Sequence, residues 1–437
     1  MVDETALWLA YCGDDFTGST DALEFLTRAG LRTALFLSPP SATQLARHPG
    51  LQAIGVAWRT RSLGPAAMEA ELRPALEALR GFGPRHVHYK VCSTFDSSPT
   101  VGSIGRAIEI GREVFSARWV PLLVAAPALG RHAVFGHLFA RLGIGSAGEI
   151  FRLDRHPSMS RHPVTPADES DLRRHLARQT TQRIALFDIL HLDAPPKERA
   201  ATLARLVGEG AEIVLFDALY ASQLSRIGAL LDAAAEEGCG PLFSVGSSGV
   251  EMALGAHWAE QGRLHPVTTW PEAGPVAPLL MVSGSCSPVT SGQIAWAEAN
   301  GFAIVPLDPA RPDERAAADL MIDHLRAGKH TVVCTSRGEA GAPVAAEELG
   351  TILGSLVRLA MERVGLKRLA IAGGDTSSYA ARALGIGSLE MIAPLAPGAP
   401  LCRVTAPGEL VDGLEVVFKG GQVGAADFFG AVVRGRL

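Results

Sequence analysis

Short apolar runs recur along the whole chain, and several are separated by longer stretches in which apolar residues have helical spacing. Short runs predict buried strands, whereas an apolar residue every three to four positions, as in Met68 to Leu79 and Asp171 to Ala177, predicts helices. Strands that alternate with helices indicate parallel sheets covered by helices. The predicted strands in the first part of the chain are residues 6–11, 32–36, 51–56, 85–91, 120–125, 184–188, 212–217 and 242–245.

Residues 264–278 interrupt this alternation, because they hold four prolines in fifteen positions. Neither a helix nor a central strand tolerates that density of proline. Predicted strands then resume at 279–283, 303–305, 331–334, 369–372 and 415–418. We therefore expect an α/β protein of two domains, residues 1–263 and 279–437, with 264–278 as the linker. Each domain should hold a mostly parallel sheet covered by helices.

Composition narrows the class of protein. The 437 residues are 47% hydrophobic and 19% charged, which supports large cores and argues against disorder. The net charge of −5 lacks the basic surplus of a nucleic-acid-binding protein. The six cysteines form no CxxC pair, and no apolar run reaches the length of a membrane span. We expect a cytoplasmic protein with neither nucleic-acid nor membrane partners.

Two adjacent carboxylates follow the first predicted strand, in the segment Gly13-Asp14-Asp15-Phe16-Thr17-Gly18-Ser19-Thr20-Asp21, and a helical pattern begins at Asp21. Ligands of α/β proteins bind at the carboxyl ends of the strands. Neighbouring carboxylates repel each other, so pairing them has a cost that neutral turn residues would avoid. The pair could orient a hydroxyl group or accept its proton. Either carboxylate alone could instead cap the helix.

Further polar residues stand beside other predicted strands. Lys90 lies in an apolar strand, where an ammonium group needs an anionic partner, either an Asp or a ligand carboxylate. Asp96 follows and could cap a helix or hold a substrate hydroxyl. Arg59 and Arg61 suit a carboxylate, although they could be solvated loop charges. In the loop 154–166, which holds two His, hydrogen bonding to a ligand is favoured over metal binding, because the loop lacks helical spacing and a carboxylate partner.

Three glycine turns in the second domain suit phosphate: Ser283 to Thr290, Gly373 to Ser378 and Lys419 to Gln422. Backbone N–H groups at the start of a helix attract anions, and glycine allows close approach. Asp375 could hold a phosphate-bound Mg²⁺, and Lys419 could reach a phosphate. None of these turns is a Walker A loop, and each alone could be only a turn.

Taken together, these motifs resemble the four-carbon acid sugar kinase family. The resemblance runs in matching order from about residue 7 to about residue 430. The segments that carry it are Gly13–Asp21, Lys90–Ser97, Met159–Pro166, Val245–Glu251, Ser283–Thr290 and Gly373–Ser377. Pro166 is followed here by Ala167, where members of that family often have methionine. That difference would affect packing or substrate fit rather than the reaction.

The resemblance implies a kinase that uses ATP and Mg²⁺ to phosphorylate the terminal hydroxyl of a small sugar acid. Threonate, erythronate, 3-oxo-tetronate or a branched oxo-acid derived from apiose are the implied substrates. The amino-terminal domain would bind the acid and the carboxyl-terminal domain the nucleotide, with the active site in the cleft between them. A non-catalytic sensor of sugar acids and an NAD(P)-dependent dehydrogenase are the alternatives, although a G-x-G-x-x-G fingerprint is missing.

The residues expected at such a site fall into three groups. The catalytic candidates are Asp15, as the group that orients the hydroxyl and accepts its proton, and Asp96 as the second choice. Expected on the substrate side are Asp14, Thr94, Arg161 and His162, with Arg61 and Lys90 holding the carboxylate. Expected on the nucleotide side are Ser283, Ser285, Gly373, Gly374, Asp375, Thr376, Lys419 and Gly420. The apolar segment 135–139 could be core or the face of a homodimer.

Overall fold

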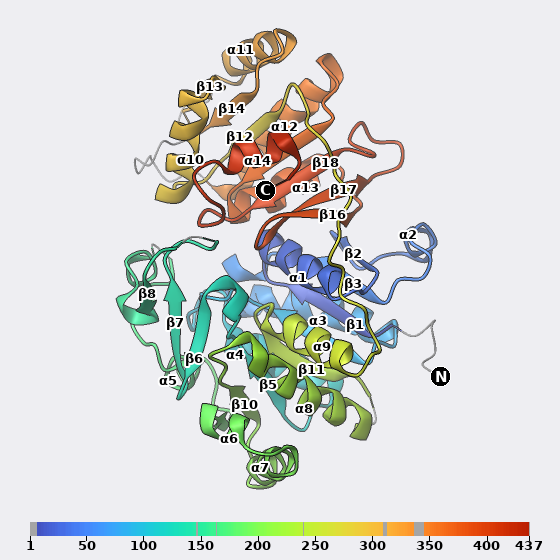
Figure 1. The fold of residues 1–437 in the computed structure, drawn as a ribbon, viewed down its shortest axis with the longest axis vertical. Coiled ribbons are helices and arrows are strands. Elements are labelled where there is room, and N and C mark those ends of the chain that lie inside the picture. Colours follow the sequence, from blue (N-terminus) through green and yellow to red (C-terminus); the bar gives the residue numbers. More distant parts are fainter. Residues whose placement is uncertain are drawn as a thin grey trace.

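The structure, a computed structural model, describes residues 7–145, 147–162, 164–238, 240–308, 313–335 and 345–436, apart from the side chains of Ala346 and Asp375. The chain forms two α/β domains, one above the other in Figure 1, with helices flanking a large sheet. The expected α/β fold of two domains is therefore confirmed. Among the described residues, no helix is long and apolar enough to cross a bilayer.

The amino-terminal domain is built on parallel strands in the order β2-β3-β1-β4-β11-β5-β10-β9. Successive residues of β1 enter two different cores: Leu9 and Tyr11 pack into one, Ala10 and Cys12 into the other. A strand buried on both faces reads as a continuous apolar run, as the sequence pattern requires. The strands are β1 (Leu9–Gly13), β2 (Thr33–Phe36), β3 (Ala53–Ala57), β4 (His86–Lys90), β5 (Val120–Leu123), β9 (Ile184–Phe187), β10 (Ile213–Phe216) and β11 (Leu242–Gly246). The helices are α1 (Phe16–Arg28), α2 (Ala42–Leu45), α3 (Pro65–Gly81), α4 (Ile104–Phe115), α5 (Leu172–Leu176), α6 (Ile189–Asp193), α7 (Pro196–Gly208), α8 (Leu224–Glu237) and α9 (Gly249–Glu260), with short 3₁₀ turns at Thr60–Ser62, Pro127–Leu129, Leu153–Arg155, Met159–Arg161 and Ala221–Gln223.

The carboxyl-terminal domain continues with the parallel strands β13-β14-β12-β15-β18 and then the antiparallel strands β17 and β16. Residues 264–276, which precede it, contain no helix or strand and run along the outside of the molecule in yellow (Figure 1). The strands are β12 (Leu280–Ser283), β13 (Ala303–Pro306), β14 (Thr331–Cys334), β15 (Arg368–Ala372), β16 (Ser388–Ala396), β17 (Ala399–Thr405) and β18 (Glu415–Lys419). The helices are α10 (Pro288–Ala299), α11 (Glu314–Arg326), α12 (Ala346–Arg363), α13 (Gly374–Ala383) and α14 (Phe428–Arg434).

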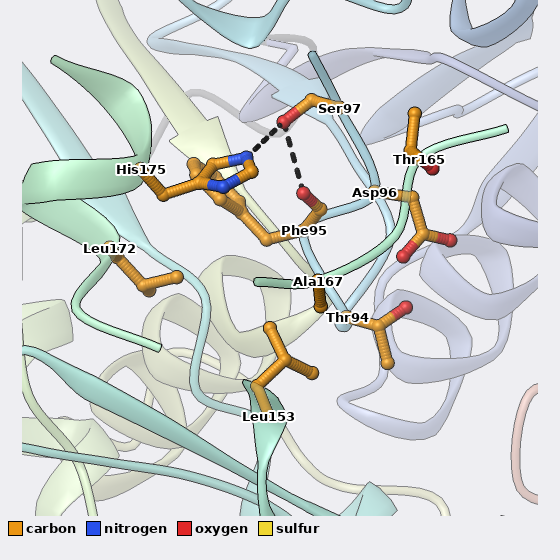
Figure 2. A pocket seen from close by; sticks show the side chains of 9 residues that line it. All are labelled: Thr94, Phe95, Asp96, Ser97, Leu153, Thr165, Ala167, Leu172 and His175. Atoms are coloured by element: carbon orange, nitrogen blue, oxygen red, sulfur yellow. Dashed lines mark hydrogen bonds between the residues drawn. The ribbon is translucent and has the colours of Figure 1, made fainter. Parts of the chain in front are cut away.

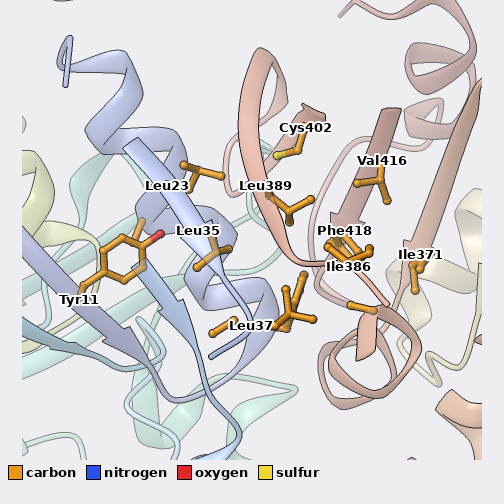
Figure 3. Close-up of a cluster of buried hydrophobic side chains, with 14 of the residues drawn as sticks. Tyr11, Leu23, Leu35, Leu37, Ile371, Ile386, Leu389, Cys402, Val416 and Phe418 are labelled. Atoms are coloured by element: carbon orange, nitrogen blue, oxygen red, sulfur yellow. The ribbon is translucent and has the colours of Figure 1, made fainter. Parts of the chain in front are cut away.

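The two domains share one sheet. Strand β16 pairs antiparallel with β2, with Leu389 opposite Leu35, so that the strands of both domains form a single 15-stranded sheet within the described residues. Leu23, Leu35 and Leu37 lie in one buried cluster with Leu389 and Phe418 (Figure 3). The relative position of the domains is therefore set by a common apolar core.

A smaller antiparallel sheet of β6 (Arg131–Val134), β7 (His137–Arg141) and β8 (Ile150–Arg152) stands at one side of the amino-terminal domain (Figure 1). The loop after β7 reaches the other domain, where the Ile144 N–H donates to the Gln422 carbonyl at 3.1 Å. Phe135, in the turn between β6 and β7, is 49% exposed, whereas Leu138 is fully buried. The segment 135–139 thus has both a core side and a surface side.

One expectation about local structure was wrong, and five strands were not predicted. The first helix begins at Phe16, not at Asp21, because the Asp15 side chain caps it by accepting from the Gly18 N–H at 2.6 Å. The segment Thr17–Thr20, which polar and glycine residues made look like a loop, is the first turn of α1. The sequence pattern also failed to predict the strands β6, β7, β8, β16 and β17, whose alternating or irregular burial gives weaker apolar runs.

Phe16 tests the shared core. Its buried ring packs against Phe418 of the other domain, with ring centroids 4.4 Å apart. Phe16→Ala should lower the free energy of unfolding by about 3–5 kcal/mol, because it removes a large buried side chain and leaves a cavity. Leu190→Ala, at a side chain 68% exposed, should change it by about 0.5 kcal/mol or less. Urea denaturation followed by circular dichroism measures both values, and equal effects of the two variants would show that the contact between the domains contributes little.

Candidate active site

The paired carboxylates lie between the end of β1 and the start of α1, and Arg61 binds both of them. Asp14 accepts from Arg61 Nε at 3.0 Å and from Nη2 at 2.7 Å, while Asp15 Oδ2 accepts from Nη1 at 2.6 Å. Both Asp side chains are nearly inaccessible to solvent. Burial raises the pKa of Asp14 to about 6, an effect that Arg61 opposes and Asp15 strengthens. The guanidinium group thus offsets the repulsion between two buried carboxylates.

Lys90 has the anionic partner that its position in a strand requires. At the end of β4 its Nζ lies 3.3 Å from Asp21 Oδ2 on α1 and donates to the Val91 carbonyl at 3.2 Å. Burial opposes the charge on Lys90, but the surrounding carboxylates, Asp21 first, outweigh that cost and raise its pKa. The sequence allowed either an Asp or a ligand carboxylate as the partner of Lys90, and in the structure the partner is the Asp21 side chain.

The loop after β4 presents Thr94 and Asp96. Ser97 holds this loop from behind, since its hydroxyl donates to the Phe95 carbonyl and contacts His175 Nε2, both at 3.0 Å (Figure 2). Phe95 has a φ of 58°, an uncommon conformation for a bulky residue, and is buried. In Figure 2 the Asp96 carboxylate lies on the opposite side of the loop from His175. Asp96 Oδ1 is buried and has no hydrogen-bond partner among the described residues.

Ala167 lies in the same region, where it lines a small cavity behind the loop together with Leu153 and Leu172 (Figure 2). Its side chain is buried. Ala167 therefore occupies a packing position.

The glycine turn at the start of α13 faces Asp15 across the boundary between the domains. A Cβ atom added at Gly374 would lie 3.5 Å from Asp15 Oδ2 and 3.8 Å from Thr17 Oγ1. Gly373 has a φ of 126°, which other residues rarely adopt, and caps α13 without a side-chain hydrogen bond. The start of this helix therefore lies close to the Asp15 carboxylate of the other domain, with no side chain of residues 373 or 374 between them.

Two further turns adjoin the first one. A Cβ at Gly421 would come within 2.9 Å of Ser285 Oγ, and one at Gly420 would lie 3.9 Å from Thr17 Oγ1. Ser285 and Thr376 are both buried beside Gly373, whose added Cβ would contact Thr376 Oγ1 at 3.3 Å. The three glycine turns that were separate in the sequence thus form one surface.

Lys419 points into its own domain and does not line the cavity between the domains. Its buried Nζ donates to Thr290 Oγ1 at 2.8 Å, and the Thr290 hydroxyl donates to the Gly421 carbonyl at 2.9 Å. Burial lowers the pKa of Lys419 to about 7. In this structure Lys419 supports the Gly420–Gly421 turn from beneath. The side chain of Asp375, the expected neighbour of Mg²⁺, lies outside the described residues.

A cavity of about 590 Å³ lies between the domains and brings most of the expected residues together. This volume is typical of small-molecule sites. The sequence-predicted residues that line it are Asp15, Arg61, Lys90, Thr94, Asp96, Arg161, His162, Gly374 and Gly420. Those that do not line it are Asp14, Ser283, Ser285, Gly373, Thr376 and Lys419, which lie behind or beside lining residues.

The small sheet and the loop after it form one wall of the cavity, and none of the cavity-lining residues Arg131, Arg141 and His156 was predicted from the sequence as a site residue. Arg131, Arg141 and His156 line the cavity, as do Asp21 and Thr17 of α1. Arg131 and Arg141 lie on strands that the apolar pattern did not predict. His156 belongs to the loop 154–166, whose composition indicated ligand binding, so this loop was the feature of the sequence that could have predicted the wall.

Comparison with known proteins agrees with the division of the chain into two domains. A sugar-binding N-terminal domain family matches residues 9–254, and a nucleotide-binding C-terminal domain family matches residues 280–429. A 3-oxo-isoapionate kinase of Paraburkholderia graminis is 43% identical over 99% of this chain and 95% of its own length. A 3-oxo-tetronate kinase of Methylobacterium radiotolerans is 32% identical over 97% of this chain and 98% of its own length. A solved structure from Salmonella typhimurium LT2 has a TM-score of 0.76 at 26% identity and covers 98% of both chains.

A sugar-binding domain and a nucleotide-binding domain meet at one cavity, and the two relatives quoted above, which match this chain over nearly its whole length, are named kinases; the protein is therefore a kinase of small carbohydrates. The length and identity of the matches make the assignment more specific. The chain belongs to the four-carbon acid sugar kinase family, and the resemblance drawn from its motifs is confirmed.

Lys419 gives a prediction about pH. An unfolded lysine titrates near pH 10.4, whereas this one titrates near 7 in the folded chain. Between these values the unfolded state binds more protons, so Lys419 makes stability increase with pH by about 1 kcal/mol per unit from pH 7.5 to 9.5. In Lys419→Met that increment should be missing. Urea denaturation of both proteins across this range measures the difference in slope, and parallel curves would contradict the lowered pKa.

Proposed function

We propose that this protein transfers the γ-phosphate of ATP to the terminal hydroxyl of a sugar acid of about four carbons. The observation that carries the proposal is the position of Asp15, whose carboxylate lies close to the bare backbone of Gly374 where the two domains meet and both residues line the cavity. Phosphoryl transfer requires a phosphate held in line with an oriented hydroxyl, and most of the catalysis is positioning and charge stabilisation. These two groups, one from each domain, would supply that arrangement.

The glycine surface of the second domain fits the phosphates of ATP. Gly373 and Gly374 leave the first turn of α13 open, and a helix start attracts anions through its free N–H groups and its dipole. Ser285 and Thr376 would add hydroxyl donors beside this turn, while Gly420 would allow the nucleotide to lie on the backbone. ATP supplies the phosphoryl group when bound.

Mg²⁺ would enter together with ATP. The described residues contain no group of three or more His, Cys, Asp or Glu side chains placed to hold a metal ion. Mg²⁺ is commonly held by substrate phosphates and only one or two carboxylates, so such a group is not required. Asp375, at the start of α13, remains the proposed neighbour of the ion.

Asp15 is the proposed general base. It lines the cavity, whereas Asp14 lies behind it and is bound at both oxygens by Arg61. Arg61 also binds Asp15 Oδ2 at 2.6 Å, so we assign it the role of positioning the two carboxylates. Lys90 would fix Asp21 in the same way. Asp15 would orient the attacking hydroxyl and accept its proton late in the transfer.

The substrate class follows from the relatives. The relative named 3-oxo-isoapionate kinase shares 43% of its residues with this chain, more than the 32% of the named 3-oxo-tetronate kinase quoted above. We therefore place the branched oxo-acid first among the candidates, ahead of 3-oxo-tetronate, threonate and erythronate.

A substrate panel tests the proposed activity. The purified protein is incubated with ATP and Mg²⁺ and with each of these four acids, and ADP release is measured. We expect turnover with at least one acid and fastest turnover with the branched oxo-acid. Absence of ADP with every acid, despite binding of an acid in calorimetry, would favour a sensor. Reduction of NAD(P) by an acid would favour a dehydrogenase.

Asp15→Asn tests the base. The amide keeps an oxygen that can cap α1 in place of the carboxylate, so the helix start should be retained. The variant cannot accept the proton, and kcat should fall about 100-fold or more. Asp168→Asn, at an exposed ion pair with Arg178, is the matched control and should keep the wild-type rate. A loss of less than about tenfold in Asp15→Asn would exclude Asp15 as the base and favour Asp96.

A further inference from the structure

Arg131 is the one buried cation of the cavity wall, within the described residues, that has no carboxylate partner. It begins β6 and is 4% exposed, and its Nη1 donates only to the carbonyls of Leu129, Gly130 and Arg141, at 3.1, 3.4 and 3.0 Å. Its Nε is buried without a partner. Lys90, the other buried cation of the cavity, and Arg61, whose side chain is 21% exposed, are both paired with Asp side chains.

This difference matters because an unpaired buried charge is costly. Burial lowers the pKa of Arg131, yet a guanidinium group keeps its proton in proteins. Asp96 is within electrostatic reach, but no Asp or Glu oxygen among the described residues lies within 4 Å of the guanidinium nitrogens. The guanidinium group of Arg131 is therefore a suitable binding site for an anionic group of a ligand.

His156 provides a second donor on the same wall. Its Nδ1 accepts the N–H groups of Ser158 and Met159, each at 3.2 Å, so the proton of the neutral ring lies on Nε2. That Nε2 atom is buried and makes no hydrogen bond of regular geometry among the described residues, although the ring also interacts with the backbone of Arg141. Burial lowers the pKa of His156, and the nearby charge of Arg131 lowers it further; the contact with the Arg141 backbone opposes this shift without reversing it.

The unpartnered acceptors of the cavity lie on other elements. Asp96 Oδ1, in the loop after β4, is buried without a hydrogen-bond partner in the described part of the chain. Asp21, on α1, is paired with Lys90 at Oδ2 and also interacts with the Ser248 hydroxyl, while its Oδ1 makes no hydrogen bond of regular geometry there. Both side chains line the cavity with Arg131 and His156. A molecule that satisfies this set carries one anionic group for the donors and several hydroxyls for the acceptors, and a polyhydroxy acid has both.

We propose that Arg131, together with His156, binds the carboxylate of the substrate and thereby selects acids over neutral polyols. This assignment rests on the proposed function and replaces the expectation that Arg61 and Lys90 hold that carboxylate. The small sheet and the loop after it would thus determine which substrates bind, while the starts of α1 and α13 would hold the groups that take part in phosphoryl transfer. Asp96 and Asp21 would receive the hydroxyls of the acid.

Arg131→Gln tests the assignment through a ratio of two substrates. The probes are the acid that gives the fastest turnover in the panel and the polyol of the same carbon skeleton, in which CH₂OH replaces the carboxylate. Loss of a charge-assisted pair should lower kcat/KM for the acid about 100-fold. It should leave kcat/KM for the polyol and the KM for ATP within about twofold, so the preference for the acid falls by the same factor of about 100.

The ratio separates substrate binding from structural support. Because Arg131 also binds three backbone carbonyls, its loss could disturb the turn before β6, but such damage would lower kcat/KM for both probes equally and would overturn the proposal. His156→Asn is the second variant, since its amide oxygen can replace Nδ1 as the acceptor while the Nε2 donor is lost. It should lower the ratio about tenfold.

Arg178→Gln, at an exposed arginine, is the control and should leave the ratio unchanged. An unchanged ratio in both Arg131→Gln and His156→Asn would overturn the assignment and leave the kinase activity standing. A wild-type protein that phosphorylates no acid would overturn the proposed function and this assignment with it.

Discussion

Helix α1 is held between the two domains by buried apolar contacts, and this packing fixes the separation of the carboxylates from the glycine turn. Phe16 follows Asp15 directly and contacts Phe418, which stands next to the turn that contains Gly420. The pairing of β2 with β16 joins the same two regions through the sheet. Because protein cores are close-packed and resist deformation, a shared core can hold reacting groups from different domains at a defined distance.

Polar contacts reinforce this junction at the other end of α1. The buried Glu24 accepts from the Gly398 N–H, in the turn between β16 and β17, at 2.8 Å. Arg382 of α13 donates to the Ala57 carbonyl at the end of β3, at 3.0 Å. The helices that line the cavity, α1 and α13, therefore also form hydrogen bonds that connect the two domains. This differs from two independent domains connected only by the segment 264–276.

The charges of the cavity are divided by location. On the side of α1, cations and carboxylates are paired with one another, so Arg61 and Lys90 organise the acidic groups. On the side of the small sheet, Arg131 binds backbone carbonyls and has no carboxylate partner among the described residues. Around α13 the surface is bare backbone. Under the proposed function, the wall with Arg131 would bind the anionic group of the substrate, the side of α1 its hydroxyl group and the start of α13 the phosphate of ATP.

The sequence by itself determined the α/β class, the parallel strands, the family and the two motifs that meet at the cavity, because continuous apolar runs and glycine turns are local signals. It did not determine which cations are available to a ligand. Lys90 and Arg61 were expected to hold the carboxylate of the substrate; both line the cavity, and folding brings Asp21 to one and Asp14 and Asp15 to the other. The tertiary structure alone decided this, since pairing depends on side chains far apart in the chain. The tertiary structure also determined that β2 and β16 join the two sheets and that Arg131 lines the cavity. The sequence pattern did not predict these features, because the strands involved are short or have alternating burial.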